Sequence, residues 1–193
     1  DGDFLSIGLE HIGPQAGRNL NVCAVVMDNG VYGLTKGQSS PTSETGMITS
    51  STPYGKVEEK TNPLSLYLTL GVSYVASAMS SKVKGLATTI VDAMEHPGFS
   101  IVHVQSPCTT YNDTYELLKG SVKKGIEPQA WTISDDHDPS DIKAATELLN
   151  RGGIPLGLLY KDTTRPDFQS RIDSMTKISD SKSTQELLDS LAI

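Results

Sequence analysis

The sequence predicts an α/β fold in which helices flank a parallel sheet. Two turn motifs, Asp1-Gly2-Asp3 and Asp28-Asn29-Gly30, lie one strand-turn-helix-strand unit apart. Residues 20–27 lie between them and form an almost continuous, β-branched apolar run, which is typical of a buried parallel strand. An amphipathic stretch at 81–96 then leads, after Pro97-Gly98, into the strand-like residues 99–104. Helices and strands that alternate in this way favour a sheet covered by helices.

The first third of the chain predicts one helix, one strand and a long loop. Apolar positions at residues 5–12 suit a helix that starts after the Gly-Asp turn. We expect this helix to kink or end near Gly13-Pro14, because proline lacks a backbone N–H. Residues 30–62 are rich in Gly, Ser, Thr and Pro. A loop of that length in a compact domain is usually functional or mobile.

The remaining elements follow from apolar spacing and turn residues. We expect, in order, a helix at 63–71, a strand at 74–78, a helix at 115–122, a loop at 126–141, a helix at 141–150 and a strand at 156–160. Ser183-Thr184-Gln185-Glu186 is a capping box, which predicts a small C-terminal helix. Residues 1–177 are therefore assigned to one domain and residues 178–193 to a tail with a short helix.

Composition narrows the class of protein. The 193 residues can bury one core, and no apolar stretch approaches the ~18 residues of a membrane span. The net charge of −7 argues against a nucleic-acid partner, because phosphate binding needs a basic face. We expect a cytoplasmic protein. Two cysteines make no disulfide framework, and Cys23, within the apolar run, is expected to be an inert core residue.

The two turn motifs predict a metal site. Asp1 and Asn29 would meet at the carboxyl edge of the sheet, and their hard oxygens suit Mg²⁺, which takes its other ligands from phosphate and water. Gly2 would let the backbone approach a diphosphate closely. Each motif alone could also be an ordinary surface turn without a ligand, because Asp-Gly-Asp is commonly a solvated turn and Asn-Gly is a common turn dipeptide.

Three histidines have structural readings. His96 precedes Pro97-Gly98 and is expected to be a cation at a helix C-terminus. His103 within a strand is expected to be a hydrogen-bonded core residue. His137 lies in an acidic stretch, for which we favour a solvated turn over a metal site.

The residues after the second motif resemble a known family. Thiamine-diphosphate enzymes share a Gly-Asp-Gly stretch followed by a distant Asn, and here the first Gly is missing. The run Asp28-Asn29-Gly30-Val31-Tyr32-Gly33-Leu34-Thr35-Lys36-Gly37-Gln38-Ser39-Ser40-Pro41-Thr42-Ser43 closely resembles the β subunit of 2-oxoacid:ferredoxin oxidoreductases. A second block, Ser106-Pro107-Cys108 with Tyr111-Asn112, matches the same family, and residues 157–160 match it weakly. The resemblance reaches from residue 1 to about residue 170.

The resemblance implies a thiamine-diphosphate-binding fold that lacks the family's N-terminal segment. It implies that Asp1, Asn29 and the Val31 carbonyl bind Mg²⁺, while Leu34 and Lys36 shape the substrate side as catalytic residues. The full implied set of cofactor-binding residues is Asp1, Gly2, Asp3, Asn29, Val31, Gly33, Leu34 and Thr35. Cys108 would be one of four thiolates on a [4Fe–4S] cluster whose other ligands lie outside this sequence. Glu10 stands before His11, where the family usually has Asn, which weakens any cofactor role for His11.

The implied activity is oxidative decarboxylation of a 2-oxoacid, with coenzyme A taking the acyl group and the cluster passing electrons to ferredoxin. An α subunit would supply the pyrimidine-binding domain, so this chain alone is expected to be inactive. Pyruvate and 2-oxoglutarate both remain open as substrates. Two alternatives are a thiamine-dependent decarboxylase or ligase without electron transfer, and a non-catalytic interaction subunit of the same fold.

Overall fold

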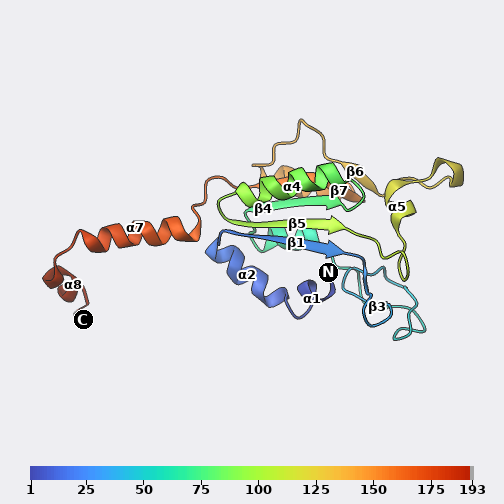
Figure 1. The fold of residues 1–193 in the computed structure, drawn as a ribbon, viewed down its shortest axis with the longest axis horizontal. Helices are drawn as coiled ribbons and strands as arrows, with labels where there is room; N and C mark the ends of the chain where they lie inside the picture. Colours follow the sequence, from blue (N-terminus) through green and yellow to red (C-terminus); the bar gives the residue numbers. More distant parts are fainter. Residues whose placement is uncertain (192–193) are drawn as a thin grey trace.

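A five-stranded sheet with helices on both faces forms the body of the molecule in the computed structural model (Figure 1). The structure describes the backbone of residues 1–191 and, apart from residues 178–180 and 191, their side chains. The strands are β1 (Val22–Asp28), β4 (Tyr74–Met79), β5 (Phe99–Gln105), β6 (Ala130–Thr132) and β7 (Ile154–Lys161), in the order β1-β5-β4-β7-β6. β1, β5 and β4 are parallel, β7 is antiparallel to β4, and β6 is parallel to β7. The predicted α/β class is confirmed, with one antiparallel junction in a mostly parallel sheet.

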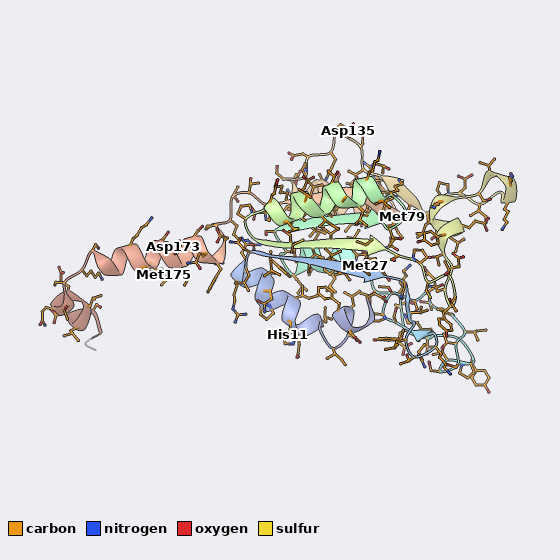
Figure 2. The ribbon with its side chains drawn as sticks, viewed as in Figure 1. His11, Met27, Met79, Asp135, Asp173 and Met175 are labelled. Atoms are coloured by element: carbon orange, nitrogen blue, oxygen red, sulfur yellow. The ribbon has the colours of Figure 1, made fainter. Side chains whose placement is uncertain are left out.

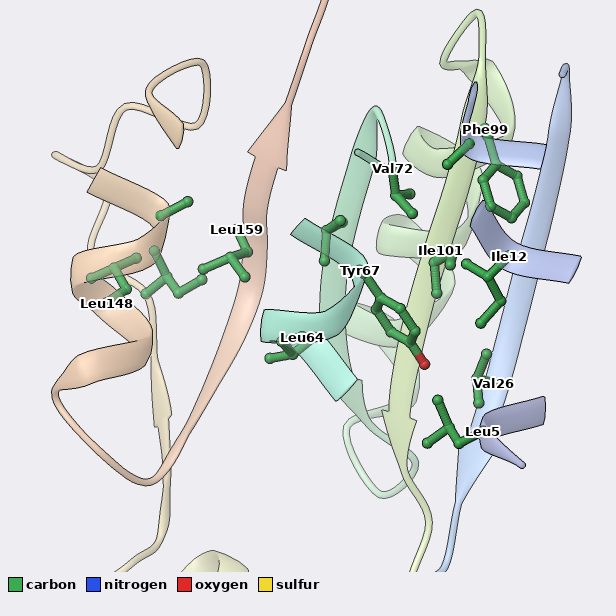
Figure 3. Close-up of a cluster of buried hydrophobic side chains, with 14 residues drawn as sticks. Leu5, Ile12, Val26, Leu64, Tyr67, Val72, Phe99, Ile101, Leu148 and Leu159 are labelled. Carbon is green, nitrogen blue, oxygen red and sulfur yellow. The ribbon is translucent and has the colours of Figure 1, made fainter. Parts of the chain in front are cut away.

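One face of the sheet holds the larger core. It is covered by α1 (Gly2–Leu5), α2 (Leu9–Arg18), α3 (Pro63–Thr69) and α6 (Ile142–Asn150). Their apolar side chains pack on those of the strands, as Figure 3 shows for Ile12, Tyr67 and Leu148 against Val26, Ile101 and Leu159. Burial of this continuous apolar set is the main free-energy term that holds the four helices to the sheet.

The other face is covered by α4 (Val83–Glu95). Leu86, Ile90 and Ala93 of this helix pack against Ala76 and Val102. The predicted helix at 81–96 is therefore confirmed, and so are its stop and the following strand. Within residues 1–191, no helix is both long and apolar enough to cross a bilayer.

The C-terminal part of the chain contains a short helix, a 3-10 turn and two further helices. α5 (Tyr115–Lys119) and the 3-10 turn η1 (Val122–Lys124) occupy the predicted helix at 115–122. α7 (Phe168–Asp180) and α8 (Thr184–Leu191) extend away from the sheet (Figure 1). The capping box at the start of α8 is confirmed, because the Ser183 N–H donates to Glu186 Oε2 at 2.7 Å and the Glu186 N–H donates to Ser183 Oγ at 3.3 Å. The last two residues of the predicted tail, 192–193, lie outside the described residues, and the domain boundary at 177/178 stays a prediction.

The predicted break near Gly13-Pro14 is wrong. α2 runs from Leu9 through Pro14 to Arg18, and the interruption lies earlier, at residues 6–8. Ile12 and Ala16 are almost completely buried under this helix, so packing outweighs the hydrogen bond that Pro14 removes. His11 lies on the outer side of α2, away from the sheet (Figure 2), which fits its weakened cofactor role.

Two further expectations of loop structure are wrong in part. The segment 126–141 contains β6, whose pairing with β7 depends on residues far along the chain. The segment 30–62 contains a small hairpin of β2 (Val31–Tyr32) and β3 (Gln38–Ser39). It also buries polar groups: Lys56 is 6% exposed and its Nζ donates to the Ser43 carbonyl at 3.0 Å. Hydrogen bonds thus hold part of this segment in a defined conformation.

The expectation that β1 is buried is also wrong. β1 is parallel, as predicted, but it is an edge strand, and Val22, Val25 and Met27 are each at least 40% exposed. Met27 is marked in Figure 2. Cys23 is only partly buried, in a groove of about 520 Å³ between β1 and α4.

The histidines are placed as expected only in part. His103 is fully buried and hydrogen bonded to Tyr67 and Asp28. His137 is half-buried rather than solvated, and its Nε2 lies 2.8 Å from the Leu159 carbonyl. His96 differs: burial, reinforced by the nearby Lys161 cation, lowers the pKa of this histidine. It is therefore neutral near pH 7, and the predicted helix-terminal cation is wrong.

Candidate cofactor and metal site

The turn after β1 places Asn29 at the carboxyl edge of the sheet. The Gly30 N–H donates to Asp28 Oδ1 at 2.9 Å, and the Val31 N–H donates to Asn29 Oδ1 at 3.0 Å. These bonds close two successive side-chain turns, which Asp and Asn favour. Gly30 has φ of +68°, a conformation that glycine adopts without strain.

Asp1 lies directly beside this turn. Its carboxylate Oδ1 accepts the Asn29 N–H at 3.3 Å, and its Oδ2 accepts the Thr42 hydroxyl at 2.9 Å. Its backbone nitrogen donates to the Met27 carbonyl at 2.8 Å. The structure therefore brings Asp1 and Asn29 together at the end of β1, in agreement with the spacing of their motifs.

A cavity of about 650 Å³ opens next to these two residues. All eight residues predicted to bind the cofactor line it: Asp1, Gly2, Asp3, Asn29, Val31, Gly33, Leu34 and Thr35. The sequence analysis missed Phe4, Tyr32 and the β1 residues 24–27, which complete the wall. The β1 residues could not be anticipated as lining because the run was expected to be buried.

Two of the predicted substrate-side residues lie at the rim. The Leu34 side chain lines the cavity and is fully exposed, so nothing in this chain covers it within the described residues. Lys36 is exposed and has φ of +75°, but it does not line the cavity. A cofactor or substrate that contacts Lys36 must therefore extend beyond the cavity wall.

The lining has a distinct shape and charge. A Cβ on Gly2 would lie 2.3 Å from a ring carbon of Tyr32, so only glycine fits against this ring. Asp1 and Asp3 contribute carboxylates, while the described lining contains no Lys, Arg or His. Such a wall repels a bare anion and attracts a cation.

Asp28 is buried directly behind the cavity. Burial alone would raise the pKa of its carboxyl, but hydrogen bonds from His103, Thr42 and the Gly30 N–H, together with the charge of the histidine, hold this pKa below its usual value. Asp28 is therefore a carboxylate at neutral pH. The sequence offered one signal for it, its place immediately before Asn29.

Cys108 lies in a loop that touches the site. The Asn112 side chain, four residues later, donates from Nδ2 to the Asn29 carbonyl at 3.0 Å. Backbone N–H groups of Tyr111, Thr110 and Asn112 point at the Cys108 sulfur and lower the pKa of this thiol. Cys108 is a free cysteine, and the described residues contain no group of three or more potential metal ligands.

Comparisons with known proteins agree with this geometry. Residues 1–104 match the family "Thiamine pyrophosphate enzyme, C-terminal TPP binding domain". Residues 108–177 match the family of the C-terminal part of the pyruvate ferredoxin oxidoreductase beta subunit. The chain belongs to the thiamine pyrophosphate enzymes. Within them it resembles the β subunit of 2-oxoacid:ferredoxin oxidoreductases, which confirms the resemblance seen in the sequence.

Individual relatives show the extent of the likeness. The chain is 35% identical to the 2-oxoacid:ferredoxin oxidoreductase subunit beta of Saccharolobus solfataricus over 89% of this chain and 59% of the relative. It is 41% identical to the 2-oxoglutarate oxidoreductase subunit KorB of Mycobacterium tuberculosis over 66% of this chain and 34% of that protein. A solved 2-oxoglutarate:ferredoxin oxidoreductase from Magnetococcus marinus, with 2-oxoglutarate, coenzyme A and succinyl-CoA bound, superposes with a TM-score of 0.86 and 41% identity, over 100% of this chain and 65% of that one. The chain thus spans a little over half the length of the S. solfataricus subunit.

Proposed function

We propose that the cavity beside Asp1 and Asn29 binds Mg²⁺-thiamine diphosphate. We further propose that the chain is part of a 2-oxoacid:ferredoxin oxidoreductase that performs coenzyme A-dependent oxidative decarboxylation. The observation that carries the proposal is that all eight cofactor-binding residues implied by the family resemblance line one cavity. The family match over residues 1–104 supports the same cofactor.

The residues present fit a magnesium diphosphate. Asp1 and Asn29 line the same cavity and would supply a carboxylate and a carboxamide oxygen, and the Val31 carbonyl is the proposed third protein ligand. The described wall holds carboxylates and no basic side chain, so a diphosphate needs a divalent cation between itself and this wall. Gly2 lets the Tyr32 ring pack directly against the backbone at this wall.

The bound cofactor would supply an electron sink for loss of CO₂ from a 2-oxoacid. The part of this chain is to bind and orient: Asp1 and Asn29 fix the diphosphate end, which fixes the reactive end in turn. Gly33, Leu34 and Thr35 line the same cavity and would contact the reactive end. Leu34 and Lys36 are exposed at the rim, where a 2-oxoacid, coenzyme A and the pyrimidine-binding α subunit would close the site.

We propose Cys108 as one ligand of a [4Fe–4S] cluster. Backbone N–H groups stabilise its thiolate, which is the form that binds iron. The Cys108 loop also contacts the proposed cofactor site, because the Asn112 side chain donates to the Asn29 carbonyl. Such a cluster takes four thiolates, so three must come from outside this sequence. Ferredoxin would accept the electrons, and free cysteines suit a cytoplasmic location.

The test uses the full-length subunit with its α partner. Reduction of ferredoxin or viologen is measured with 2-oxoglutarate and with pyruvate, in the presence of coenzyme A. We expect turnover, its loss in Asn29→Ala, and unchanged turnover in Asn150→Ala, which alters an exposed asparagine at the end of α6. Decarboxylation without electron transfer would favour the lyase alternative, and no Mg²⁺-thiamine diphosphate binding would overturn the proposal.

A further inference from the structure

A continuous line of hydrogen bonds leads from the core to the proposed metal site. The Tyr67 hydroxyl lies 3.1 Å from His103 Nδ1, and His103 Nε2 lies 2.9 Å from Asp28 Oδ2. Asp28 Oδ1 accepts the Thr42 hydroxyl at 2.7 Å, and the same hydroxyl oxygen lies 2.9 Å from Asp1 Oδ2. Five residues from separate segments meet in this line, and the bonded pair Asp28 and His103 is 75 positions apart along the chain.

Every residue of this hydrogen-bonded line except Asp1 is buried. Tyr67, His103, Thr42 and Asp28 are between 0% and 7% exposed. None of these four is among the described residues that line the cavity. A buried carboxylate is stable only when donors surround it, and Asp28 has three: His103, Thr42 and the Gly30 N–H. Such a fully bonded network holds its members in one arrangement.

We propose that Thr42, backed by Asp28, His103 and Tyr67, is a positioning residue that orients the Asp1 carboxylate for Mg²⁺. This inference rests on the function proposed above. The Asn29 N–H occupies one lone pair of Asp1 Oδ1 and Thr42 occupies one of Oδ2, which fixes the plane of the carboxylate. Each oxygen keeps a free lone pair for the metal.

The direction of each bond supports this role. His103 Nε2 faces the Asp28 carboxylate, which can only accept, so this nitrogen carries a proton; Nδ1 faces the Tyr67 hydroxyl and accepts its proton when the imidazole is neutral. The single hydroxyl proton of Thr42 lies within reach of both Asp28 Oδ1, at 2.7 Å, and Asp1 Oδ2, at 2.9 Å, so this hydroxyl joins the buried carboxylate to the one at the cavity. Outer partners of this kind orient metal ligands, and their loss typically weakens metal affinity about 10–100-fold.

The experiment measures the Mg²⁺ concentration needed for thiamine diphosphate binding by the full-length complex, by calorimetry or by quenching of protein fluorescence. Thr42→Val removes the hydroxyl at nearly constant volume, and Thr42→Ser keeps it. We expect Thr42→Val to raise the Kd for Mg²⁺ about 10–100-fold and Thr42→Ser to restore it to within about threefold. Thr88→Val, at an exposed threonine of α4, is the matched control and should leave the Kd unchanged.

A second variant, Tyr67→Phe, keeps the ring and removes only the far hydroxyl. We expect a smaller rise in the Kd for Mg²⁺, with binding of thiamine diphosphate at saturating Mg²⁺ unchanged. A purely structural role would weaken both equally. If Thr42→Val does not fold, Tyr67→Phe decides alone. Wild-type Mg²⁺ affinity in the folded variants would overturn the inference, whereas a wild-type complex that binds no Mg²⁺-thiamine diphosphate would overturn the proposed function instead.

Discussion

The turn at Gly30 has no room for one added carbon. In Gly30→Ala, the new Cβ would lie 2.7 Å from Asn112 Nδ2, with φ still at +68°. The left-handed backbone costs about 1–2 kcal/mol for alanine, and restricting the unfolded chain offsets about 0.4–1 kcal/mol of this. Displacing Asn112 also breaks its bond to the Asn29 carbonyl, worth about 0.5–1.5 kcal/mol. We therefore expect a loss of about 0.5–3 kcal/mol in the free energy of unfolding.

Gly125 provides a control with the same backbone. Its φ is +66°, and no described atom beyond its chain neighbours lies within 4 Å of the position of a Cβ. Gly125→Ala places alanine in the same unfavourable left-handed backbone conformation but introduces no steric clash. The difference between the two variants, about 0.5–1.5 kcal/mol, therefore measures the contact between Asn112 and the turn.

Urea unfolding of the full-length subunit, followed by fluorescence and circular dichroism, measures both variants. In an Asn112→Ala background the excess cost of Gly30→Ala should disappear, because the clash and the bond are both gone. Equal destabilisation by Gly30→Ala and Gly125→Ala in the wild-type background would refute the reasoning, since it would mean that Asn112 does not hold the turn.

Three further outcomes are expected. Ile101→Ala, in the centre of the core, should cost about 2–5 kcal/mol in urea unfolding, while Val122→Ala, fully exposed, should stay within about 0.5 kcal/mol; similar costs would contradict the placement of the core. Because the pKa of Asp28 is lowered in the folded state, its stabilising contribution is complete above the unfolded value of about 4 and is lost as the pH falls below it. Asp28→Asn should therefore flatten the fall of unfolding free energy in acid, and an unchanged slope would argue against a lowered pKa. In cluster-free protein near neutral pH, iodoacetamide should label Cys108 faster than Cys23, since burial raises the pKa of Cys23; mass spectrometry showing the reverse order would count against the N–H groups around Cys108.

The sequence was informative where structure is decided locally. Helices such as α4 and α6 follow from apolar spacing and stop residues within one segment, and both were predicted within two residues at each end. Asp1, Gly2 and Asn29 of the cavity wall were found because they fall in two short motifs joined by one crossover, whose length brings their ends together; the other predicted wall residues came from the family resemblance.

What the sequence did not reveal depends on residues far apart in the chain. The sequence of β6 resembles a polar loop, and only its pairing with β7 makes it a strand. No local feature of the sequence indicates that β7 is antiparallel to β4. The line behind Asp1 joins Tyr67 and His103 to Asp28 through side chains that have no sequence spacing in common. His103 could be recognised as a bonded core residue, but its partners could not be named.

β1 shows a conflict between pattern and placement that has a physical meaning. An unbroken β-branched run indicates a strand covered on both sides, yet Val22 and Met27 are each 49% exposed and Val25 is 40% exposed at the edge of the sheet. An exposed apolar edge is an aggregation hazard that natural proteins usually cover. The Asp1 nitrogen donates a hydrogen bond to the Met27 carbonyl at this edge, so one backbone acceptor of β1 already has a partner.

The remaining groups of this edge can be assigned from the ladder. In a parallel pair, alternate residues point their N–H and C=O groups to the same side. The Met27 carbonyl faces away from β5, so Cys23 and Val25 face the open edge, while Ala24 and Val26 bond to β5. In the 193-residue chain we therefore expect the amide protons of Cys23 and Val25 to exchange with D₂O much faster than those of Ala24 and Val26, as measured by NMR. Equal protection of the four amides would mean that the edge is already paired in solution, because an amide exchanges slowly only while its hydrogen bond is closed.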